Sequence, residues 1–476
     1  MKRIALSNRL RRMPIWAAAA MCPTVALADL DFVQGWQSVV AGSPAYAVVS
    51  TQSAAGQAKA DQALALWRPQ VLLSAGAGWA GQRTSVEGAG FTAPGMGTSQ
   101  DVAFRTQVDR GLGTALTLVA QQPLVHAGRR ASARQLEAMA SLADLQGQAE
   151  RQALVWRLVE SHLQVLQATE VLRTAEAEVS AAERAADAAR ERFDSGASPV
   201  TDLLDARSRR DLASARGVQA RQALIVAQLS YRQLTSQPEA MPAEIPSPLL
   251  AAPAVAQEAV WLQMALDQGL ARRMAEASVA IAQAEVDQHL ATSNWSLDLV
   301  GRISDERLRG EGPHATGGQD ARATARNHWV GLQLQVPLYT GGMQGAQHRE
   351  ASLALQAALA RQQEVGEWVA RDVRAAWLGL RSAQAQLEAS EQAQRSTQER
   401  LGAARTGHDV GHRTVLELLD AERDALHAQT QVMTARHQVV LARLRLESLA
   451  GSLDEAALMR INDWLWSKPS SMSTRP

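Results

Sequence analysis

One feature limits the possible folds of this chain more than any other, and it is an internal repeat. The segment GHRTVLELLDAERDALHAQ at 411–429 resembles GASPVTDLLDARSRRDLAS at 196–214. A second pair of segments, QQPLVHAGRR at 121–130 and QVPLYTGGMQ at 335–344, keeps the same offset to within one residue. Because both landmarks recur in the same order and spacing, the chain is expected to hold two halves built on one plan.

Each half is expected to contribute a long helical hairpin that follows a shorter helix. The stretches between the landmarks are rich in alanine and glutamine, and a short turn containing glycine separates each long helix from a returning one. A helix of about 60 residues is about 90 Å long, which exceeds the diameter of an ordinary domain. The predicted helices are 47–66, 131–193 and 199–234 in the first half, and 257–290, 345–405 and 414–449 in the second.

The returning helix of the second half carries two apolar stripes about 100° apart. The main stripe has the 3-4 spacing of a coiled coil, and its alanines let helix backbones approach closely. A helix with packing partners on two sides is typical of the wall of a tube. The alternative is a solvent-exposed helix with scattered alanines, but the regular spacing is kept over about four heptads and argues against it. The main stripe consists of Leu418, Ala421, Ala425, Ala428, Val432, Ala435, Val439, Ala442, Leu446 and Leu449. The second stripe consists of Leu419, Leu426, Met433 and Val440. The first half repeats the main stripe, interrupted by Arg210, at Leu203, Ala206, Ala213, Ala220, Leu224, Ala227 and Leu234.

Segments of alternating apolar and polar residues precede each long helix. From 330 to 338, for example, every second residue is valine or leucine. This period of two predicts strands with one apolar and one wet face. Strands are expected near 70–79, 116–124, 296–303 and 330–338, with surface loops rich in glycine, serine and threonine at 80–110 and 304–327.

Four strands are too few to close a membrane barrel, which needs at least about eight. Open strand edges are not tolerated in lipid. If these strands enter a membrane, several chains must therefore complete one barrel, and strand count alone leaves the number of chains open.

The first 28 residues are typical of an export signal. Basic residues precede a short apolar stretch, and Ala26-Leu27-Ala28 forms a cleavage site. The apolar stretch is too short to span a bilayer, and no later run is long enough. The only cysteine, Cys22, lies in this segment, so the mature chain is expected to have no thiol for a disulfide or a zinc site. A lipidation cysteine is the alternative, although Met21 before it fits poorly.

The predicted division of the chain follows from these features. It comprises a signal peptide (1–28), an N-terminal helix (29–68), a first strand pair with its surface loop (69–125), a first helical hairpin (126–236), a linker rich in proline and alanine (237–256), the opening helix of the second half (257–293), a second strand pair with its loop (294–340), a second helical hairpin (341–450) and a C-terminal tail (451–476).

Composition and motifs argue against several other classes of protein. Hydrophobic residues make up 46% of the chain but aromatic residues only 4%, which suits closely packed helices better than a bulky core. The formal net charge is zero, so the charge balance gives no indication of a basic surface that binds nucleic acid.

Motifs that could carry enzyme chemistry are weak. The G-x-G-x-x-G match at 76–81 is expected to run into a loop, whereas a dinucleotide site needs a helix there. His408 and His412 have the spacing of helical metal ligands, but Gly407 and Gly411 place them in a turn with no third ligand nearby. No nucleophile is paired with a base. The chain is therefore expected not to be an enzyme and to bind no cofactor or metal.

Taken together, these features resemble the TolC family of outer-membrane channel proteins. The most specific pieces are PLYTGG at 337–342 with PLVHAG at 123–128, and VGHRTVLELLDAERDALHAQ at 410–429 with SGASPVTDLLDAR at 195–207. The resemblance covers nearly the whole mature chain. It implies a mixed, mainly α fold in which long coiled-coil helical hairpins form a periplasmic tunnel. Four strands per chain would contribute to a trimeric transmembrane β-barrel of twelve strands.

The resemblance also implies a function and partners. The protein would be a homotrimer in the bacterial outer membrane, surrounded there by outer-membrane lipid, and it would extend into the periplasm. It would work with a periplasmic adaptor (membrane fusion) protein and an inner-membrane ABC transporter to export a protein or small-molecule cargo, without nucleic acid. Within the family it is similar to the type I secretion members, which export toxins. The alternatives are a drug-efflux outer-membrane factor and, in a different class, a soluble periplasmic coiled-coil adaptor.

Acidic residues at the start of both returning helices form the candidate site. A carboxylate in the first turn of a helix interacts favourably with the helix dipole, which explains such residues without any function. The resemblance implies instead that Arg413 links to Asp202 of the other hairpin and holds the periplasmic end closed. It also implies that Glu417 and Asp420 ring the narrowest opening. The family archetype has a tyrosine at the position of His408, so the part of His408 in the gate stays open. The candidate periplasmic gate residues are Thr201, Asp202, Arg413, Glu417 and Asp420.

Overall fold

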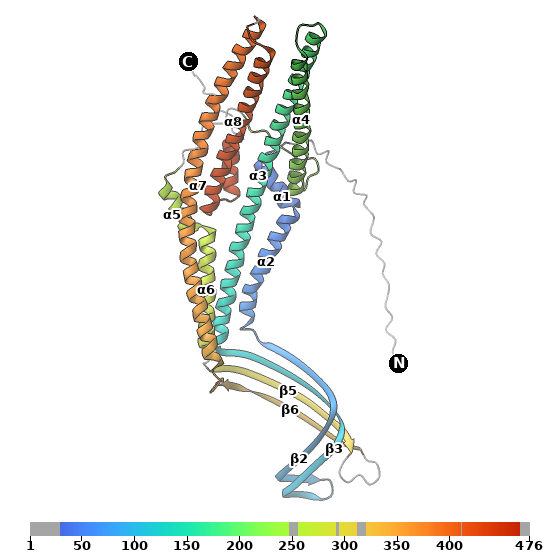
Figure 1. Ribbon diagram of the computed structural model, residues 1–476. Coiled ribbons are helices and arrows are strands. Elements are labelled where there is room, and N and C mark those ends of the chain that lie inside the picture. The colour runs from blue at the N-terminus through green and yellow to red at the C-terminus, as the bar shows by residue number, and fades with distance from the viewer. Residues whose placement is uncertain (1–28, 247–255, 292–294, 312–319, 411, 467–476) are drawn as a thin grey trace, which may run out of the picture.

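The structure, a computed structural model, describes residues 29–246, 256–291, 295–311, 320–410 and 412–466. The predicted signal peptide lies outside these residues. The molecule is elongated, with two helical hairpins projecting at one end and a four-stranded sheet at the other (Figure 1). None of the described helices combines the length and apolar character needed to cross a membrane.

Each half of the chain folds into one long helical hairpin, as the repeat predicts. The first hairpin consists of α3 (Ala127–Asp194) and α4 (Val200–Thr235), and the second of α7 (Met343–Asp409) and α8 (Val415–Leu449). With 68 residues, α3 is about 100 Å long. The two hairpins pack against each other through α3 and α8. The chain is therefore mainly helical and built as two similar units side by side.

The main apolar stripe of α8 is largely buried, as its spacing predicts. In the part nearest the turn, Ala421 and Ala425 pack against Leu401 and Ala404 of α7 in one small apolar cluster. In the second stripe Val440 is buried, so α8 has partners on more than one side. The buried residues of the main stripe are Ala421, Ala425, Ala428, Val432, Ala435, Val439 and Leu446, and those of its first-half copy are Leu203, Ala206, Ala213 and Ala220.

The shorter helix of each half is broken in two, whereas a single helix was predicted. In the first half α1 (Phe32–Gly42) ends at extended Ser43, and Pro44 starts α2 (Pro44–Ala65). In the second half α5 (Glu258–Gln268) and α6 (Leu270–Ala291) meet at Gly269, whose ψ is 127°. A side chain at Gly269 would collide with the carbonyl oxygen of Ala265, so only glycine fits this break.

The sheet contains four antiparallel strands in the order β2-β3-β5-β6. They are β2 (Gln70–Ala93), β3 (Gly97–His126), β5 (Ser296–Glu311) and β6 (Asp320–Gln335). Strands from both halves therefore meet at the β3–β5 pair. Within the described residues β2 pairs only with β3 and β6 only with β5, which leaves two open edges.

The loops predicted at 80–110 and 304–327 are wrong over most of their length, because the strands continue through them. Residue pairing between β2 and β3 runs to Ala93 and Gly97, with bulges near Ala80 and Ala89. The G-x-G-x-x-G match at 76–81 therefore lies inside a strand. Backbone pairing does not require an apolar face, so strands can extend where the alternation that revealed them has faded.

The predicted C-terminal tail contains a helix that belongs to the main core. Helix α9 (Glu455–Trp466) buries Leu458 and Ile461 against α1 and α3. Its Asn462 accepts a hydrogen bond from the N–H of Phe32 (3.1 Å) and donates one to Asp31 Oδ2 (3.2 Å). Nearby, β1 (Asp29–Leu30) pairs in parallel with β4 (Met241–Pro242) from the predicted linker. The two ends of the described chain thus close one core about halfway along the molecule.

Candidate functional site

The second hairpin turns between α7 and α8, and α8 starts on a capping box. The hydroxyl of Thr414 accepts a hydrogen bond from the N–H of Glu417 (3.2 Å), and the Glu417 carboxylate accepts one from the N–H of Thr414 (2.9 Å). The backbone hydrogen bond, aided by the charge of Arg413, lowers the pKa of Glu417. Within one chain Glu417 therefore acts as a helix cap, which is the simpler of its two predicted roles.

Arg413 and His408 both belong to this turn. The carbonyl of Gly407 accepts hydrogen bonds from the N–H groups of His412 (2.8 Å) and Arg413 (3.1 Å). A side chain at Gly407 would lie 3.1 Å from Cγ of Arg413, so the arginine lies across this glycine. In the tautomer that carries a proton on Nδ1, His408 donates to the carbonyl oxygen of Arg413 (3.3 Å). His408 thus helps to hold the backbone of the tip.

The first hairpin presents the other two predicted gate residues. Thr201 and Asp202 are exposed in the first turn of α4, after the N-cap residue Pro199. The tips of the two hairpins lie apart in one chain (Figure 1), and no ion pair among the described residues joins Asp202 to Arg413. Arg413 is exposed as well. The predicted bridge between these two residues is therefore not made within the single chain.

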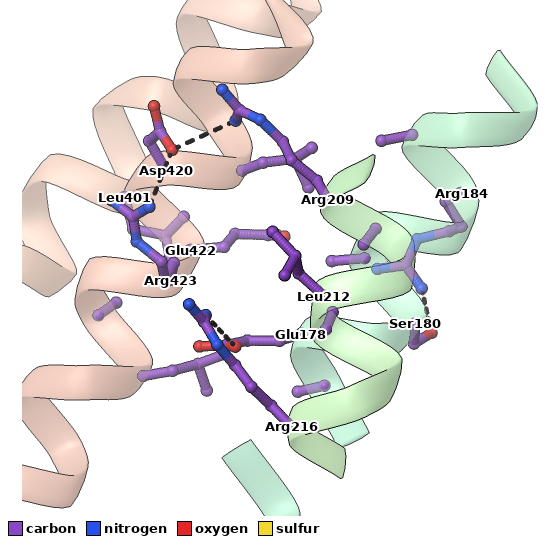
Figure 2. Close-up of a pocket in the computed structure, with 18 of the residues that line it drawn as sticks. Glu178, Ser180, Arg184, Arg209, Leu212, Arg216, Leu401, Asp420, Glu422 and Arg423 are labelled. Carbon is purple, nitrogen blue, oxygen red and sulfur yellow. Dashed lines mark hydrogen bonds and ion pairs between the residues drawn. The ribbon is translucent and has the colours of Figure 1, made fainter. Parts of the chain in front are cut away.

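Asp420 makes a connection between the hairpins that the sequence does not predict. Its Oδ1 lies 3.7 Å from Nη1 of Arg209 on α4 and 3.5 Å from Nη1 of Arg423 on its own helix (Figure 2). Both Asp420 and Arg209 are about half exposed. The acid predicted to ring an opening is thus paired with a cation of the neighbouring hairpin.

Glu178 of α3 forms a second group of ion pairs further along the hairpins. Its side chain is only 12% exposed and lies 3.7 Å from Nη1 of Arg216 on α4. The other carboxylate oxygen lies 3.4 Å from Nε2 of His427 on α8, a contact that carries a charge only when the histidine is protonated. The contact of Glu178 with His427 joins the two hairpins, as the Asp420–Arg209 pair does, whereas its contact with Arg216 stays within the first hairpin.

A pocket of about 620 Å³ separates the hairpins at the level of these ion pairs (Figure 2). Leu212 and Ala213 of α4 and Leu401 of α7 line it, together with residues of α3 and α8. Further from the tips α3 and α8 touch directly, with the hydroxyls of Thr174 and Thr430 3.2 Å apart. The hairpins of one chain are therefore packed tightly in their middle and loosely near the tips.

Sequence reasoning missed Arg209, Glu178 and Arg216, because it concentrated on acids at the helix starts. One signal was available: Arg209 and Arg216 lie seven residues apart, which places them on the same face of α4. Within the described residues no group of three or more histidine, cysteine or acidic side chains could hold a metal ion. The arrangement offers a charged, loosely packed contact between two long helical hairpins.

Comparisons with known proteins agree with this architecture. The family model described as "Outer membrane efflux protein" matches residues 36–237 and 261–452, one segment in each half of the chain. Outer membrane protein TolC of Escherichia coli is 30% identical over 354 residues, covering 71% of this chain and 69% of the relative. Protein CyaE of Bordetella pertussis is 30% identical over 448 residues, covering 90% of this chain and 85% of the relative.

Two further matches bear on function and on fold. Alkaline protease secretion protein AprF of Pseudomonas aeruginosa is 26% identical over 352 residues, covering 72% of this chain and 70% of the relative. The crystal structure of the Campylobacter jejuni CmeC outer membrane channel superposes with a TM-score of 0.69 at 14% identity, covering 93% of this chain and 90% of that one. The structural match concerns the fold alone.

Proposed function

Since the chain belongs to the outer membrane efflux protein family, which contains the TolC-like channels, we propose that it is the outer-membrane duct of a type I protein-secretion system. The protein is an export channel of the bacterial outer membrane and extends into the periplasm. The observation that carries the proposal is the pairing of an open four-stranded sheet with helical hairpins about 100 Å long. A sheet at a membrane and a long helical tube together suit a conduit better than a binding protein.

The open sheet supports closure of the barrel by several chains, and we propose that there are three. Unpaired edges at β2 and β6 would cost several kcal/mol for each unsatisfied backbone group in lipid. Three chains would bring twelve strands, an even number within the range of known barrels. The β2 edge of one chain would then pair with the β6 edge of the next. Exposed leucines on one face of the sheet, among them Leu73, Leu118 and Leu332, would face lipid in such a barrel.

The hairpin tips are proposed to form the periplasmic gate. Arg413 and Asp202 are both exposed in one chain and would meet when neighbouring chains bring their tips together. Thr201 lies beside Asp202, and Glu417 would face the same opening. Asp420 and Arg209 would restrain the two hairpins within each chain. The gate would then be held by contacts between chains and within chains, and opening would require both to yield.

The proposed partners are a periplasmic adaptor protein and an inner-membrane ABC transporter. The hairpin tips lie at the end furthest from the sheet, where a periplasmic partner would approach (Figure 1). The ion pairs there are half exposed and individually weak, about 0.2–1 kcal/mol each, so binding of an adaptor could break them.

The cargo is proposed to be a protein, because one relative covering most of this chain is named as a protease secretion protein. Drug efflux is the second candidate, favoured by the description of the family model. The soluble adaptor alternative does not hold, since the family and its TolC members are outer-membrane proteins.

Gene deletion separates secretion from drug efflux. We expect deletion to abolish export of a protein cargo into the medium and to leave resistance to small antibiotics nearly unchanged. The wild-type gene should restore the export. A variant with the signal segment 1–28 removed serves as the control, because it should remain in the cytoplasm and restore nothing. Normal protein export by the deletion strain, together with lost drug resistance, would replace the proposal with the efflux alternative.

A further inference from the structure

Polar side chains join the two hairpins of one chain between the central core and the tips. The hydroxyls of Thr174 on α3 and Thr430 on α8 are 3.2 Å apart, and nearer the tips Glu178 meets His427. By contrast, the contact between α7 and α8 nearest their turn is apolar. We name the contacts between α3 and α8 the polar seam, which consists of Gln167 with Thr434, Thr174 with Thr430, and Glu178 with His427.

Glu178 carries the negative charge of the polar seam. Its side chain is only 12% exposed, and its two carboxylate oxygens lie 3.7 Å from Nη1 of Arg216 and 3.4 Å from Nε2 of His427. Both distances are longer than the about 2.7–2.9 Å of a strong charge-assisted hydrogen bond. A carboxylate that is largely withdrawn from water is costly unless it is strongly paired. A further positive charge beside Glu178 would therefore strengthen the contact that supplies it.

His427 can supply this charge. Its side chain is 57% exposed, so protons reach it from solvent. Histidine is the side chain whose ordinary titration lies between about pH 5 and 8. A neutral ring offers Glu178 a weak hydrogen bond at most, whereas a protonated ring forms an ion pair with it. Arg216 belongs to the same hairpin as Glu178, so the contact with His427 is the one that spans the two hairpins.

The other charged groups around His427 already have partners. On its own helix Arg423 and Asp424 lie one turn before it and form an ion pair of 3.2 Å. The α7 side chains that line a groove together with His427 are uncharged, among them Gln386 and Ser390. The ion pairs that surround the seam are Arg400 with Asp424, Arg405 with Glu422 and Glu391 with Arg436 towards α7, and Arg209 with Asp420 and Arg221 with Glu176 towards α4.

Within the described residues His427 forms no ion pair besides the one with Glu178. A proton added to His427 therefore acts mainly on the contact between the hairpins. Glu178 also lines the pocket that opens towards the tips, so this contact stands where tight packing of the hairpins gives way to loose packing.

We propose that His427 and Glu178 form an acid-operated latch between the two hairpins of each chain. A fall in pH protonates His427, and the resulting ion pair holds the hairpins together at the base of the pocket. A rise in pH removes the charge and leaves the weaker polar contacts. The latch should change the ratio of joined to separated hairpins by roughly twofold to fivefold per chain. This inference rests on the proposed gate at the tips and does not depend on what the channel exports.

The pH dependence of conductance in planar bilayers tests the latch. His427→Gln removes the titrating group, Glu178→Gln removes its partner, and His427→Arg keeps a positive charge at every pH used. The matched control is His348→Gln, which changes a histidine at the opposite end of the long hairpin, close to the start of α7. All five proteins are compared at about pH 8 and about pH 5.5, on either side of the ordinary titration of histidine.

We expect wild type and His348→Gln to conduct less at the lower pH. His427→Gln and Glu178→Gln should both lose this response, and His427→Arg should show the low conductance at both pH values. Glu178→Gln retains the histidine charge, so it separates the latch from a direct effect of that charge on ion flow.

Distances between the tips provide a second measurement that does not depend on conduction. Spin labels are attached through Ala197→Cys and Val410→Cys, which are exposed at the tips of the first and second hairpins. Labelled chains are diluted with unlabelled ones, so that each distance lies within one chain. The distance should be shorter at about pH 5.5 than at about pH 8 with His427 present, and it should not change with pH when His427→Gln is added.

Four results would overturn the inference: wild-type conductance that does not fall in acid, an acid response that survives in His427→Gln or Glu178→Gln, high conductance of His427→Arg at the higher pH, or a tip distance that is the same at both pH values. Failure of the proposed function is separate. It would appear as normal protein export by the deletion strain, whereas the distance between the tips would still report on the latch.

Discussion

Asp420 and Arg209 join the two helical hairpins of one chain, with Oδ1 of the acid 3.7 Å from Nη1 of the base. The contact lies at the pocket between the hairpins and close to their tips (Figure 2). It gives Asp420 a cationic partner inside each chain, so this acid contributes less negative charge to a shared opening than an unpaired carboxylate would. We propose that Arg209 restrains the hairpins through this contact.

Loss of Arg209 should loosen the tip. We expect Arg209→Ala to raise single-channel conductance in planar bilayers. A half-exposed ion pair contributes about 1 kcal/mol or less, so its loss should change the ratio of open to closed tips by up to about fivefold per chain. Arg207→Ala removes an exposed arginine on the same helix and should leave conductance unchanged. Equal conductance of the two variants would show that the Asp420–Arg209 pair does not restrain the tip.

The proposed bridge between chains gives a stronger prediction. A charge-assisted hydrogen bond between Arg413 and Asp202 would contribute about 1.5–3 kcal/mol when partly buried in the assembled tip. Its loss should favour the open tip by roughly tenfold to a hundredfold. We expect Arg413→Ala and Asp202→Ala each to raise conductance and to sensitise cells to large antibiotics, and the double variant to add little. Additive effects in the double variant would indicate that these residues do not contact each other.

Glu417 allows its charge to be separated from its role as a helix cap. Glutamine can complete the capping box with Thr414 but carries no charge, whereas alanine removes both functions. If Glu417 lines the opening, Glu417→Gln and Glu417→Ala should reduce cation selectivity alike, and only the alanine variant should lower stability. Reversal potentials in a salt gradient measure the selectivity. Unchanged selectivity in Glu417→Gln would leave this residue as a cap only.

Much of the fold could be predicted from the spacing of apolar residues and of the repeated turn motif. Coiled-coil stripes mark α4 and α8, and the two copies of the turn motif mark both hairpins. The length of the strands could not be predicted, because alternation is visible only where one face is apolar. The break at Gly269 was missed for a similar reason, since a helix pattern of apolar residues continues on both sides of it.

The candidate site was predicted in part. Charged residues near the turns could be found from the repeat, but the partner of Asp420 depends on how two hairpins of one chain pack together. Arg209 and Asp420 lie far apart in the sequence, and no local pattern links them. The Arg413–Asp202 bridge stays a prediction, because it requires contacts beyond one chain.

The buried histidines predict acid sensitivity in the central core. Burial lowers the pKa of His162 to about 4, and it lowers that of His437, beside Arg436, to about 4. In the unfolded chain both titrate near 6.5, so protons bind the unfolded state first as the pH falls. The stability contributed by neutral histidine is thus present above pH 6.5 and is lost between about 6.5 and 4, at up to about 3 kcal/mol each.

His162→Gln tests this dependence. Glutamine can keep the hydrogen bond to the carbonyl of Ala243, which lies 3.0 Å from Nε2 of His162, but it does not titrate. The unfolding temperature of this variant should fall less than that of wild type between pH 7 and pH 4. His412→Gln, at an exposed position, should behave like wild type. A pH profile of His162→Gln parallel to that of wild type would assign the acid sensitivity to other groups.

The central claim is that several chains close one membrane barrel through the open edges of the sheet. Cysteine pairs placed along β2 and β6 test it directly, since the natural cysteine lies in the predicted signal segment. After oxidation in isolated outer membranes, we expect matched pairs to give one cross-linked species with three times the monomer mass, and single cysteines to give none. A monomer or dimer as the only membrane species, or a ladder without an upper limit, would contradict a closed ring of three chains.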